Sequence, residues 1–360
     1  TETAGVMFEP ESPIVQFDKI YLKEFGHLRI FNSASTLLLN NEDSVEGDST
    51  VSRLEAEGVL QLPNTFIVNQ INLSIIGDLV GGNDLTIGDG TNQSLVTLNA
   101  YTAKRYSSYS PNQDIYQFNN VLIRNNGYLN LNTYDGNGSG NNAQGLQDYG
   151  VNLQVNGNLT VESGGKIHTD GKGYGRDSGP GVGCGPSYGG YGAIDSWSGT
   201  PYGSTKEPTS LGSGGCTGDY YGNMSFGGEG GGAMKVSVLG TLTNNGVISS
   251  NGGSGTSNVA QGATGTGGSI WVVANTINGS GVIAANGGVR GGARGSSGGR
   301  IAIYESIRGN FPLNRKSNLQ AFGGGGSSYG GPGTIYIDED GQPSGNGDLW
   351  INNNDIDTFV

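Results

Sequence analysis

The sequence predicts an all-β fold, a right-handed parallel β-helix (solenoid) that carries a long loop excursion rich in Gly and Tyr. Three observations lead to this prediction. A five-residue motif recurs along the second half of the chain, short apolar segments precede its copies, and 69 of the 360 residues are Gly. This share of Gly is far above the usual roughly 7% and disfavours long helices. The glycines also lack the strict three-residue period of collagen.

The recurring motif begins with an aliphatic residue and ends with Gly. Its copies are residues 167–171, 248–252, 283–287 and 319–323. The last three copies begin at residues 248, 283 and 319, so they are 35 and 36 residues apart. A period of this length, built from short strands, is typical of a solenoid.

Short apolar strands are expected around these copies. They are residues 153–155, 234–238, 270–273, 301–304 and 334–337. Apolar and polar side chains alternate between residues 234 and 251, and Gly or Asn stands at each break. This pattern predicts three short strands per turn with alternate side chains pointing inward. Gly and Asn suit the corners because they tolerate positive φ.

The first part of the chain shows the same pattern less regularly. Strands are expected at residues 17–22, 27–31, 66–73, 85–87 and 121–124. The acidic stretch 42–57 could cap the terminal coil, which a repeat stack requires. We therefore expect an N-terminal cap with the first irregular coils in residues 1–60. The solenoid should occupy residues 61–360, and we favour one continuous domain.

A long excursion interrupts the period at residues 173–232. The motif copies at 167 and 248 are 81 residues apart, against 35 for the next step. The segment is rich in Gly, Tyr and Ser and contains both cysteines. Long ordered loops in compact domains are usually functional, so the excursion is the first place to look for a binding site.

The charge balance restricts the partners. The formal net charge is −13, which argues against nucleic acid and against anionic membrane surfaces. No apolar stretch approaches the about 20 residues that a membrane-spanning helix needs. Residues 1–4 do not have the pattern of a signal peptide. We expect a piece of a larger exported chain.

Four Gly-rich segments resemble a known class of sequences. They are residues 267–273, 279–288, 298–304 and 331–337. They resemble the Gly-rich β-strand-repeat segments of very large secreted or surface proteins, mostly bacterial, that are described as adhesin-like. The resemblance covers roughly residues 150–355. It implies a secreted or cell-surface β-helix module, one among many in a larger parent chain, and it implies no catalytic residues.

The chain has only two cysteines and two histidines. Two histidines make a multi-histidine metal site improbable. Cys184 and Cys216 are 32 residues apart and lack zinc-ligand spacing. In an exported chain they are expected to form a disulfide that holds the excursion, and two free thiols are the alternative.

The densest polar group lies at the start of the excursion. Lys166, His168 and Asp170 alternate onto one strand face, and Arg176 follows. A polysaccharide lyase or glycoside hydrolase would need such a base, cation and carboxylate. The simpler interpretation, which we favour, is a solvated strand face.

Aromatic side chains form a second group within the excursion. The candidates for ligand binding are Tyr174, Tyr188, Tyr191, Trp197, Tyr202, Tyr220 and Tyr221, and Phe226 accompanies them. Outward-facing rings of this kind suit stacking on sugar rings or contact with a protein partner. The alternative is that these rings form the small core of the excursion itself.

No cofactor is required by any motif, although calcium is possible. Residues 81–90 partly match the calcium-binding nonapeptide of β-roll proteins, but only one copy is present. Residues 338–341 and 352–357 are other oxygen-rich candidates. Asp and Asn also favour turns without any metal.

The favoured functional hypothesis is a non-catalytic adhesion or carbohydrate-binding module at the cell surface. It would bind polysaccharide or a surface glycan through the aromatic residues of the excursion. The first alternative is a lyase or hydrolase on the same scaffold, which rests on fold analogy alone. The second alternative is a passive stalk or fibre segment.

Overall fold

The computed structural model describes most of the chain. The described residues are 6–8, 12–30, 35–100, 115–133, 150–193, 198–220, 223–255, 262–339 and 346–355. Within these ranges the chain forms strands, turns and extended segments but no helix. No helix in the described ranges could therefore cross a membrane.

The chain divides into two compact units. Unit 1 comprises residues 1–131, 151–168 and 238–247, and unit 2 comprises residues 132–150, 169–237 and 248–360. The cap predicted for residues 1–60 and the solenoid predicted for residues 61–360 stay predictions. The expectation of one continuous domain stays a prediction.

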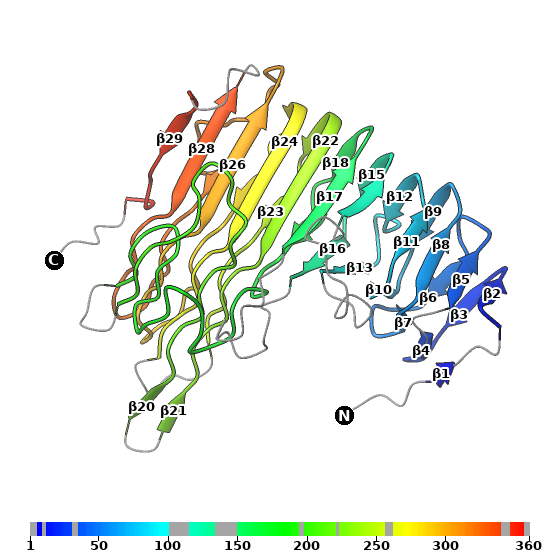
Figure 1. The fold of residues 1–360 in the computed structure, drawn as a ribbon, viewed down its shortest axis with the longest axis horizontal. Coiled ribbons are helices and arrows are strands. Elements are labelled where there is room, and N and C mark those ends of the chain that lie inside the picture. Colours follow the sequence, from blue (N-terminus) through cyan, green and yellow to red (C-terminus); the bar gives the residue numbers. More distant parts are fainter. Residues whose placement is uncertain are drawn as a thin grey trace. The chain divides into compact units, whose positions relative to one another are not determined.

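Unit 1 consists of stacked parallel strands (Figure 1). One sheet holds, in spatial order, β1 (Val6–Phe8), β4 (His27–Ile30), β7 (Arg53–Ala56), β10 (Asn72–Ile75), β13 (Ser94–Asn99), β16 (Gly127–Asn132) and β19 (Lys166–His168). A second sheet holds β2 (Ile14–Phe17), β5 (Thr36–Leu39), β8 (Val59–Leu62) and β11 (Leu79–Gly81).

The remaining strands of unit 1 complete its coils. A third sheet contains β9 (Thr65–Val68), β12 (Asp84–Ile87), β15 (Asn120–Ile123) and β18 (Leu159–Val161). Strands β14 (Ile115–Phe118) and β17 (Val151–Val155) pair with each other, as do β3 (Ile20–Leu22) and β6 (Val45–Gly47). Each turn of the chain thus supplies three short parallel strands, as the alternation predicted.

Apolar ladders fill the interior of unit 1. Equivalent positions on successive strands of the third sheet are occupied by Phe66, Leu85, Val121, Leu159 and Leu242. All five side chains are buried. The ladder arises because a parallel register brings the inward position of each coil onto that of the next.

Unit 2 carries the C-terminal coils. Strands β24 (Ser269–Asn278), β26 (Arg300–Glu305) and β28 (Thr334–Glu339) pair in parallel, and β29 (Asp348–Trp350) joins β28 antiparallel. Strands β25 (Val282–Ala284) and β27 (Leu319–Gln320) also pair in parallel. Strands β22 (Ala233–Asn244) and β23 (Val247–Ser249) contribute residues to both units. A small antiparallel hairpin, β20 (Gly218–Tyr220) and β21 (Asn223–Ser225), projects from unit 2 (Figure 1).

The recurring five-residue motif forms one corner of the coils of unit 2. Its fourth position supplies a side-chain oxygen that accepts the backbone N–H of the next copy. Asp170 Oδ1 accepts from Asn251 N at 2.7 Å, and Asn251 Oδ1 accepts from Asn286 N at 2.8 Å. Asn286 Oδ1 in turn accepts from Phe322 N at 2.8 Å. Each corner amide is therefore satisfied by the preceding coil.

Between the strands of unit 2, the Gly-rich segments pack together as a lattice of extended backbones. We call residues 171–193, 210–217, 225–232, 250–255, 262–268, 285–299 and 321–333 the glycine lattice. Consecutive amides in it bond to different neighbours. Gly173 N donates to Gly230 O at 2.7 Å, whereas Tyr174 N donates to Gly212 O at 3.0 Å. An extended chain with three residues per turn permits such bonding in several directions, unlike a flat sheet.

The lattice requires Gly because its backbones touch. A Cβ added at Gly230 would lie 1.9 Å from Gly212 O, and one at Gly214 would lie 1.9 Å from Gly175 O. The sequence suggested that these stretches are an excursion and loops carried on one edge. That description needs correction for the glycine lattice, because its backbone groups bond to one another and make these parts of the excursion belong to the packed body of unit 2.

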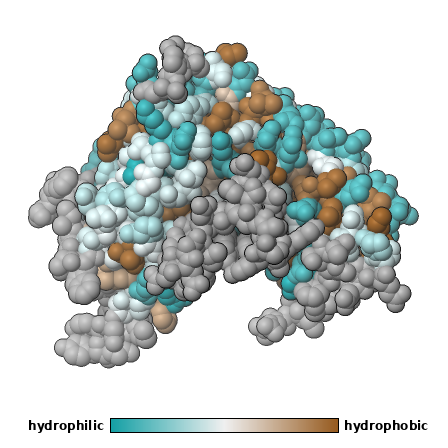
Figure 2. Space-filling view, in the orientation of Figure 1, coloured by the Kyte–Doolittle hydropathy of each residue, from teal (hydrophilic) through white to brown (hydrophobic). Residues whose placement is uncertain are grey.

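The predicted architecture is thus confirmed as all-β, with long parallel sheets consistent with a β-solenoid. On the face shown in Figure 2, hydrophobic residues appear as separate spots among white and teal residues. The apolar ladders therefore lie mainly inside, as the alternation requires.

Candidate functional site

A row of aromatic side chains lies on the outer face of unit 2. Trp271 on β24, Tyr304 on β26 and Tyr336 on β28 come from neighbouring parallel strands. The ring centroids of Trp271 and Tyr304 are 6.4 Å apart, and those of Tyr304 and Tyr336 are 5.7 Å apart. The inward neighbours Ile270 and Val272 are buried, so strand alternation turns Trp271 outward.

Trp271 and Lys235 lie together at one end of this row. Lys235 Nζ, on β22, lies 3.7 Å from the centroid of the Trp271 ring. Within the described ranges this is the only interaction recorded for the Lys235 ammonium, and Trp271 Nε1 has no hydrogen-bond partner. A shielded indole N–H usually finds a partner. The Nε1 atom itself is buried, so the Lys235 ammonium is the donor of this pair that a ligand with acceptor oxygens can reach.

The other end of the row holds part of the excursion against the sheet. The Tyr304 hydroxyl donates to Lys206 O at 2.9 Å, and Lys206 Nζ lies 5.4 Å above the Tyr336 ring. Burial, reinforced by the negative charges nearby, raises the pKa of Tyr304 to about 12. Its hydroxyl stays protonated at neutral pH and keeps this contact. Tyr336 is buried, so only Trp271 and Tyr304 are accessible in the row.

A buried arginine fixes the excursion beside the row. Arg300 Nε donates to Tyr202 O at 3.0 Å, and Nη1 donates to the hydroxyls of Thr205 and Thr334 at 2.9 and 3.0 Å. Nη2 donates to Tyr188 O at 3.3 Å. The guanidinium thus joins strands β26 and β28 to two stretches of the excursion through neutral acceptors.

Three aromatic residues predicted to bind ligand pack inside unit 2. Tyr174 and Tyr188 are buried, and the Tyr188 hydroxyl bonds Ser269 Oγ at 2.5 Å. Burial raises the pKa of Tyr188 to about 12. Tyr202 is half-buried, with its ring centroid 4.7 Å from that of Tyr188 and its hydroxyl donating to Leu211 O. In the described arrangement Tyr174 and Tyr188 have no exposed ring face for a sugar, because they serve as core of the excursion.

The other aromatic candidates divide between exposed and undescribed positions. Tyr191 is 58% exposed and Phe226 is 39% exposed, with Arg176 Cζ 4.7 Å from the Phe226 centroid. Trp197 and Tyr221 lie outside the described residues, and for Tyr220 only the backbone, in β20, is described. Tyr191 and Phe226 therefore remain candidates for contact with a ligand.

The four residues considered for catalysis are placed in different surroundings. Lys166 and His168 flank buried Ile167 on β19 in unit 1. Asp170 lies in unit 2, where its carboxylate accepts from Ser249 Oγ and Asn251 N. Arg176 is exposed beside Phe226. Asp170 therefore has a structural role at a corner, which differs from both the catalytic role and the solvated strand face that the sequence suggested.

The predicted disulfide is confirmed. Cys184 and Cys216 are bonded, with their Cα atoms 4.9 Å apart. The bond lies beside an isolated parallel bridge between Gly183 and Gly215. It therefore joins two segments of the glycine lattice that neighbouring backbones already hold together.

Oxygen-rich turns were the candidates for calcium. In residues 81–90 the Asp89 carboxylate accepts from the backbone N–H of Thr91 and Asn92, which is a turn contact. Residues 338–341 and 352–357 are described only in part. No group of three or more His, Cys, Asp or Glu suited to a metal occurs in the part of the chain that the structure describes. Calcium stays a prediction.

The comparisons with known proteins found no match for this chain. No protein-family model, curated protein or solved structure matches it. The candidate site therefore rests on the geometry of its own residues.

Sequence reasoning overlooked the Trp271 row. Trp271, Tyr304 and Tyr336 stand within strands that were used only as evidence for the repeat. Their alternation with buried Ile and Val residues is the signal that could have identified an outward-facing row. The unpaired donors could not be found this way, because they depend on which side chains the neighbouring strands supply.

Proposed function

We propose that this chain is a non-catalytic, polysaccharide-binding module of a larger secreted or cell-surface protein, built on a right-handed β-helix. The observation that carries the proposal is the Lys235 ammonium beside the accessible ring of Trp271 in the aromatic row. A half-buried indole ring offers apolar surface to a sugar, and the ammonium beside it offers bonds to oxygen atoms. Sugar hydroxyl, ring and carboxylate oxygens fit both requirements.

Several features support the rest of the proposal. The disulfide fits an oxidising compartment. The glycine lattice and Arg300 hold the excursion rigidly, so the exposed rings of Tyr191 and Phe226 could add contacts at little entropic cost. One site of this kind is weak, and repetition in a parent protein would raise the avidity.

The test compares polysaccharide binding by the intact chain and by variants. Trp271→Ala and Lys235→Gln would be incubated with polygalacturonate, alginate and cellulose, and retention and polymer length would both be measured. We expect each variant to lose about tenfold in affinity, equivalent to about 1.4 kcal/mol. Trp350→Ala is the matched control, because Trp350 is exposed on β29 outside this row.

Each outcome decides between the functional hypotheses. A loss confined to the Trp271 and Lys235 variants supports the site, and a greater loss on anionic polymers assigns Lys235 to a sugar carboxylate. If the polymer retains the intact chain and no variant weakens this retention, the binding site does not lie in this row. Shortened polymer replaces the proposal with a lyase or hydrolase. No retention of the intact chain on any polymer replaces it with a stalk.

A further inference from the structure

The second sheet of unit 1 stops abruptly at β11. In the described residues β11 pairs with β8 on one edge and has no partner on the other. The strand of the next coil on this side, β14, pairs with β17 and likewise leaves its other edge without a partner. On the adjoining face the same two coils are joined, because β12 pairs with β15. The ladder is therefore broken on one side of the stack alone.

The free edges of β11 and β14 direct backbone N–H and C=O groups toward each other. Leu60 N donates to Asp78 O at 2.8 Å, so Asp78 is directed toward β8. Alternate residues of a parallel strand bond to opposite sides, which turns the N–H and C=O groups of Leu79 and the N–H of Gly81 away from β8. Gly81 and Gly82, with φ of 78° and 70°, then turn the chain at the corner, and the Asn83 carbonyl accepts Asn120 N at 2.9 Å from the next coil.

The same argument orients β14. Asn156 N donates to Phe118 O at 2.9 Å, so Phe118 is directed toward the β17 side. The backbone groups of Ile115 and Gln117 are then directed the other way, toward β11. Backbone N–H and C=O groups that could bond to a further strand therefore line both sides of the gap.

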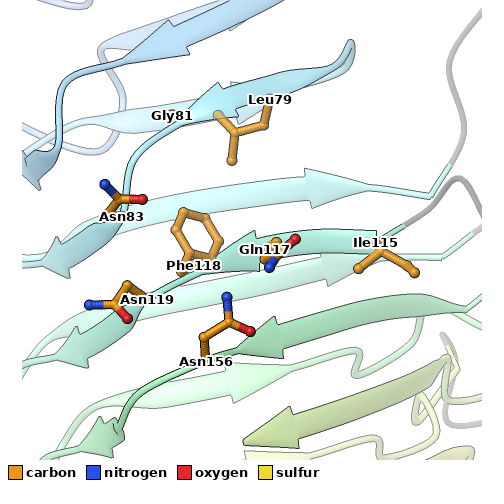
Figure 3. Close-up of a pocket in the computed structure, with 8 residues that line it drawn as sticks. All are labelled: Leu79, Gly81, Asn83, Ile115, Gln117, Phe118, Asn119 and Asn156. Atoms are coloured by element: carbon orange, nitrogen blue, oxygen red, sulfur yellow. The ribbon is translucent and has the colours of Figure 1, made fainter. Parts of the chain in front are cut away.

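A crevice of about 620 Å³ occupies this gap (Figure 3). Its lining consists of Leu79, Gly81, Asn83, Ile115, Gln117, Phe118, Asn119 and Asn156. None of these side chains is charged, and four of them are carboxamides. The bonds of Asn119 N and Asn120 N to Asn83 O close the crevice at the corner between β11 and β12.

The side chains of the walls suit a neutral, partly apolar occupant. Ile115 is 46% exposed at the rim, and neighbouring Val80 is 50% exposed. The Gln117 carboxamide has no hydrogen-bond partner in the described part of the chain. Phe118 supplies an aromatic ring in Figure 3, but it is only 2% exposed. The crevice therefore offers a sugar no accessible ring on which to stack.

We propose that the crevice binds one extended, uncharged polypeptide segment of a partner protein as an added strand between β11 and β14. Such a segment has donors and acceptors along both edges, which both walls require. It would run parallel to β11 and β14, as every strand of this sheet does, and place alternate side chains against Ile115 and Val80. The proposal is independent of the Trp271 row, which lies in unit 2.

The test uses thiol trapping, because the described residues contain no free cysteine. The probe is a synthetic peptide that copies the uncharged residues 58–62, since β8 already pairs with β11 in this register. A thiol is placed at each peptide position in turn, and disulfide formation with a Gln117→Cys chain is measured. Gln61→Cys is the matched control, because Gln61 is also an exposed glutamine but both edges of β8 are occupied.

Strand addition predicts trapping by the Gln117→Cys chain at alternate peptide positions, about tenfold above the intervening ones and above the control. Methylation of alternate peptide amides should abolish it, because it removes the donors of one edge. Equal trapping at all positions, equal trapping by the Gln61→Cys control, or no trapping overturns the proposal. Loss of trapping in the presence of neutral cello-oligosaccharides also overturns it and assigns the crevice to a glycan.

Discussion

The side-chain oxygen of Asn251 accepts the backbone N–H of Asn286, 35 residues later in the chain, at 2.8 Å. Asn251 itself donates its N–H to Asp170 Oδ1, so it lies in the middle of a three-step ladder. Asn at this motif position therefore links one coil to the next as well as tolerating a turn. The ladder ends at Phe322, whose side chain has no amide oxygen to offer.

We expect Asn251→Ala to lower the free energy of unfolding by about 1–2 kcal/mol, because the Asn286 N–H loses its acceptor. Urea denaturation followed by circular dichroism would measure this loss. Asn251→Asp keeps an acceptor oxygen and should cost clearly less. Equal losses in the two variants would contradict a role for the ladder bond.

Gly230→Ala should destabilise the chain by about 2 kcal/mol, because its Cβ would lie 1.9 Å from Gly212 O and the lattice would have to separate. Gly175→Ala is the matched control within the same lattice. A Cβ there meets no atom within 4 Å, so its effect should stay within about 0.5 kcal/mol. Thermal unfolding of both variants would measure this difference. If these residues lay in a loose loop, the two variants would be equally stable.

A turn in unit 1 places a bulky residue in the left-handed region. Glu24 and Phe25 have φ of 52° and 67°, and Phe25 is 60% exposed. Gly suits this position far better, so Phe25→Gly should raise the free energy of unfolding by about 0.5–1 kcal/mol. Phe25→Ala retains the strain and should change little. Chemical denaturation measures both, and a gain with Ala equal to that with Gly would show that strain is not the cause.

The stability that the Asp89 carboxylate contributes should be lost at acid pH. Bonds from Asn92, through its side chain and its backbone, and from Thr91 N lower the pKa of the Asp89 carboxyl from 3.8 to about 2. A lowered pKa means that the stabilisation is complete above about pH 4 and is lost as the pH falls through about 2. Titration of this carboxyl by NMR would give the pKa directly.

The control for Asp89 is the Asp89→Asn variant. It should be less stable than the natural chain near neutral pH, and the difference should shrink as the pH falls toward about 2. A difference that stays constant across this range would mean that the carboxylate charge is not involved.

The sequence by itself determined the strands, the repeat and the disulfide. Alternation is a local property, so Ile270 and Val272 marked an inward face without knowledge of their partners. With two cysteines in the chain, only one internal pairing of Cys184 and Cys216 was open. The spacing of the motif copies at 283 and 319 likewise matched the observed register, in which Ile283 lies opposite Leu319.

Only the tertiary structure decided which side chains are exposed to a ligand. Tyr188 and Tyr191 are three residues apart in a similar Gly-rich context, yet one is buried against Ser269 and the other is 58% exposed. Gly carries no side chain that could indicate the inner side of a segment, so burial in the lattice depends on backbones distant in the sequence. The unpaired donors of Lys235 and Trp271 and the broken ladder between β11 and β14 arise for the same reason, because each requires the position of a neighbouring coil.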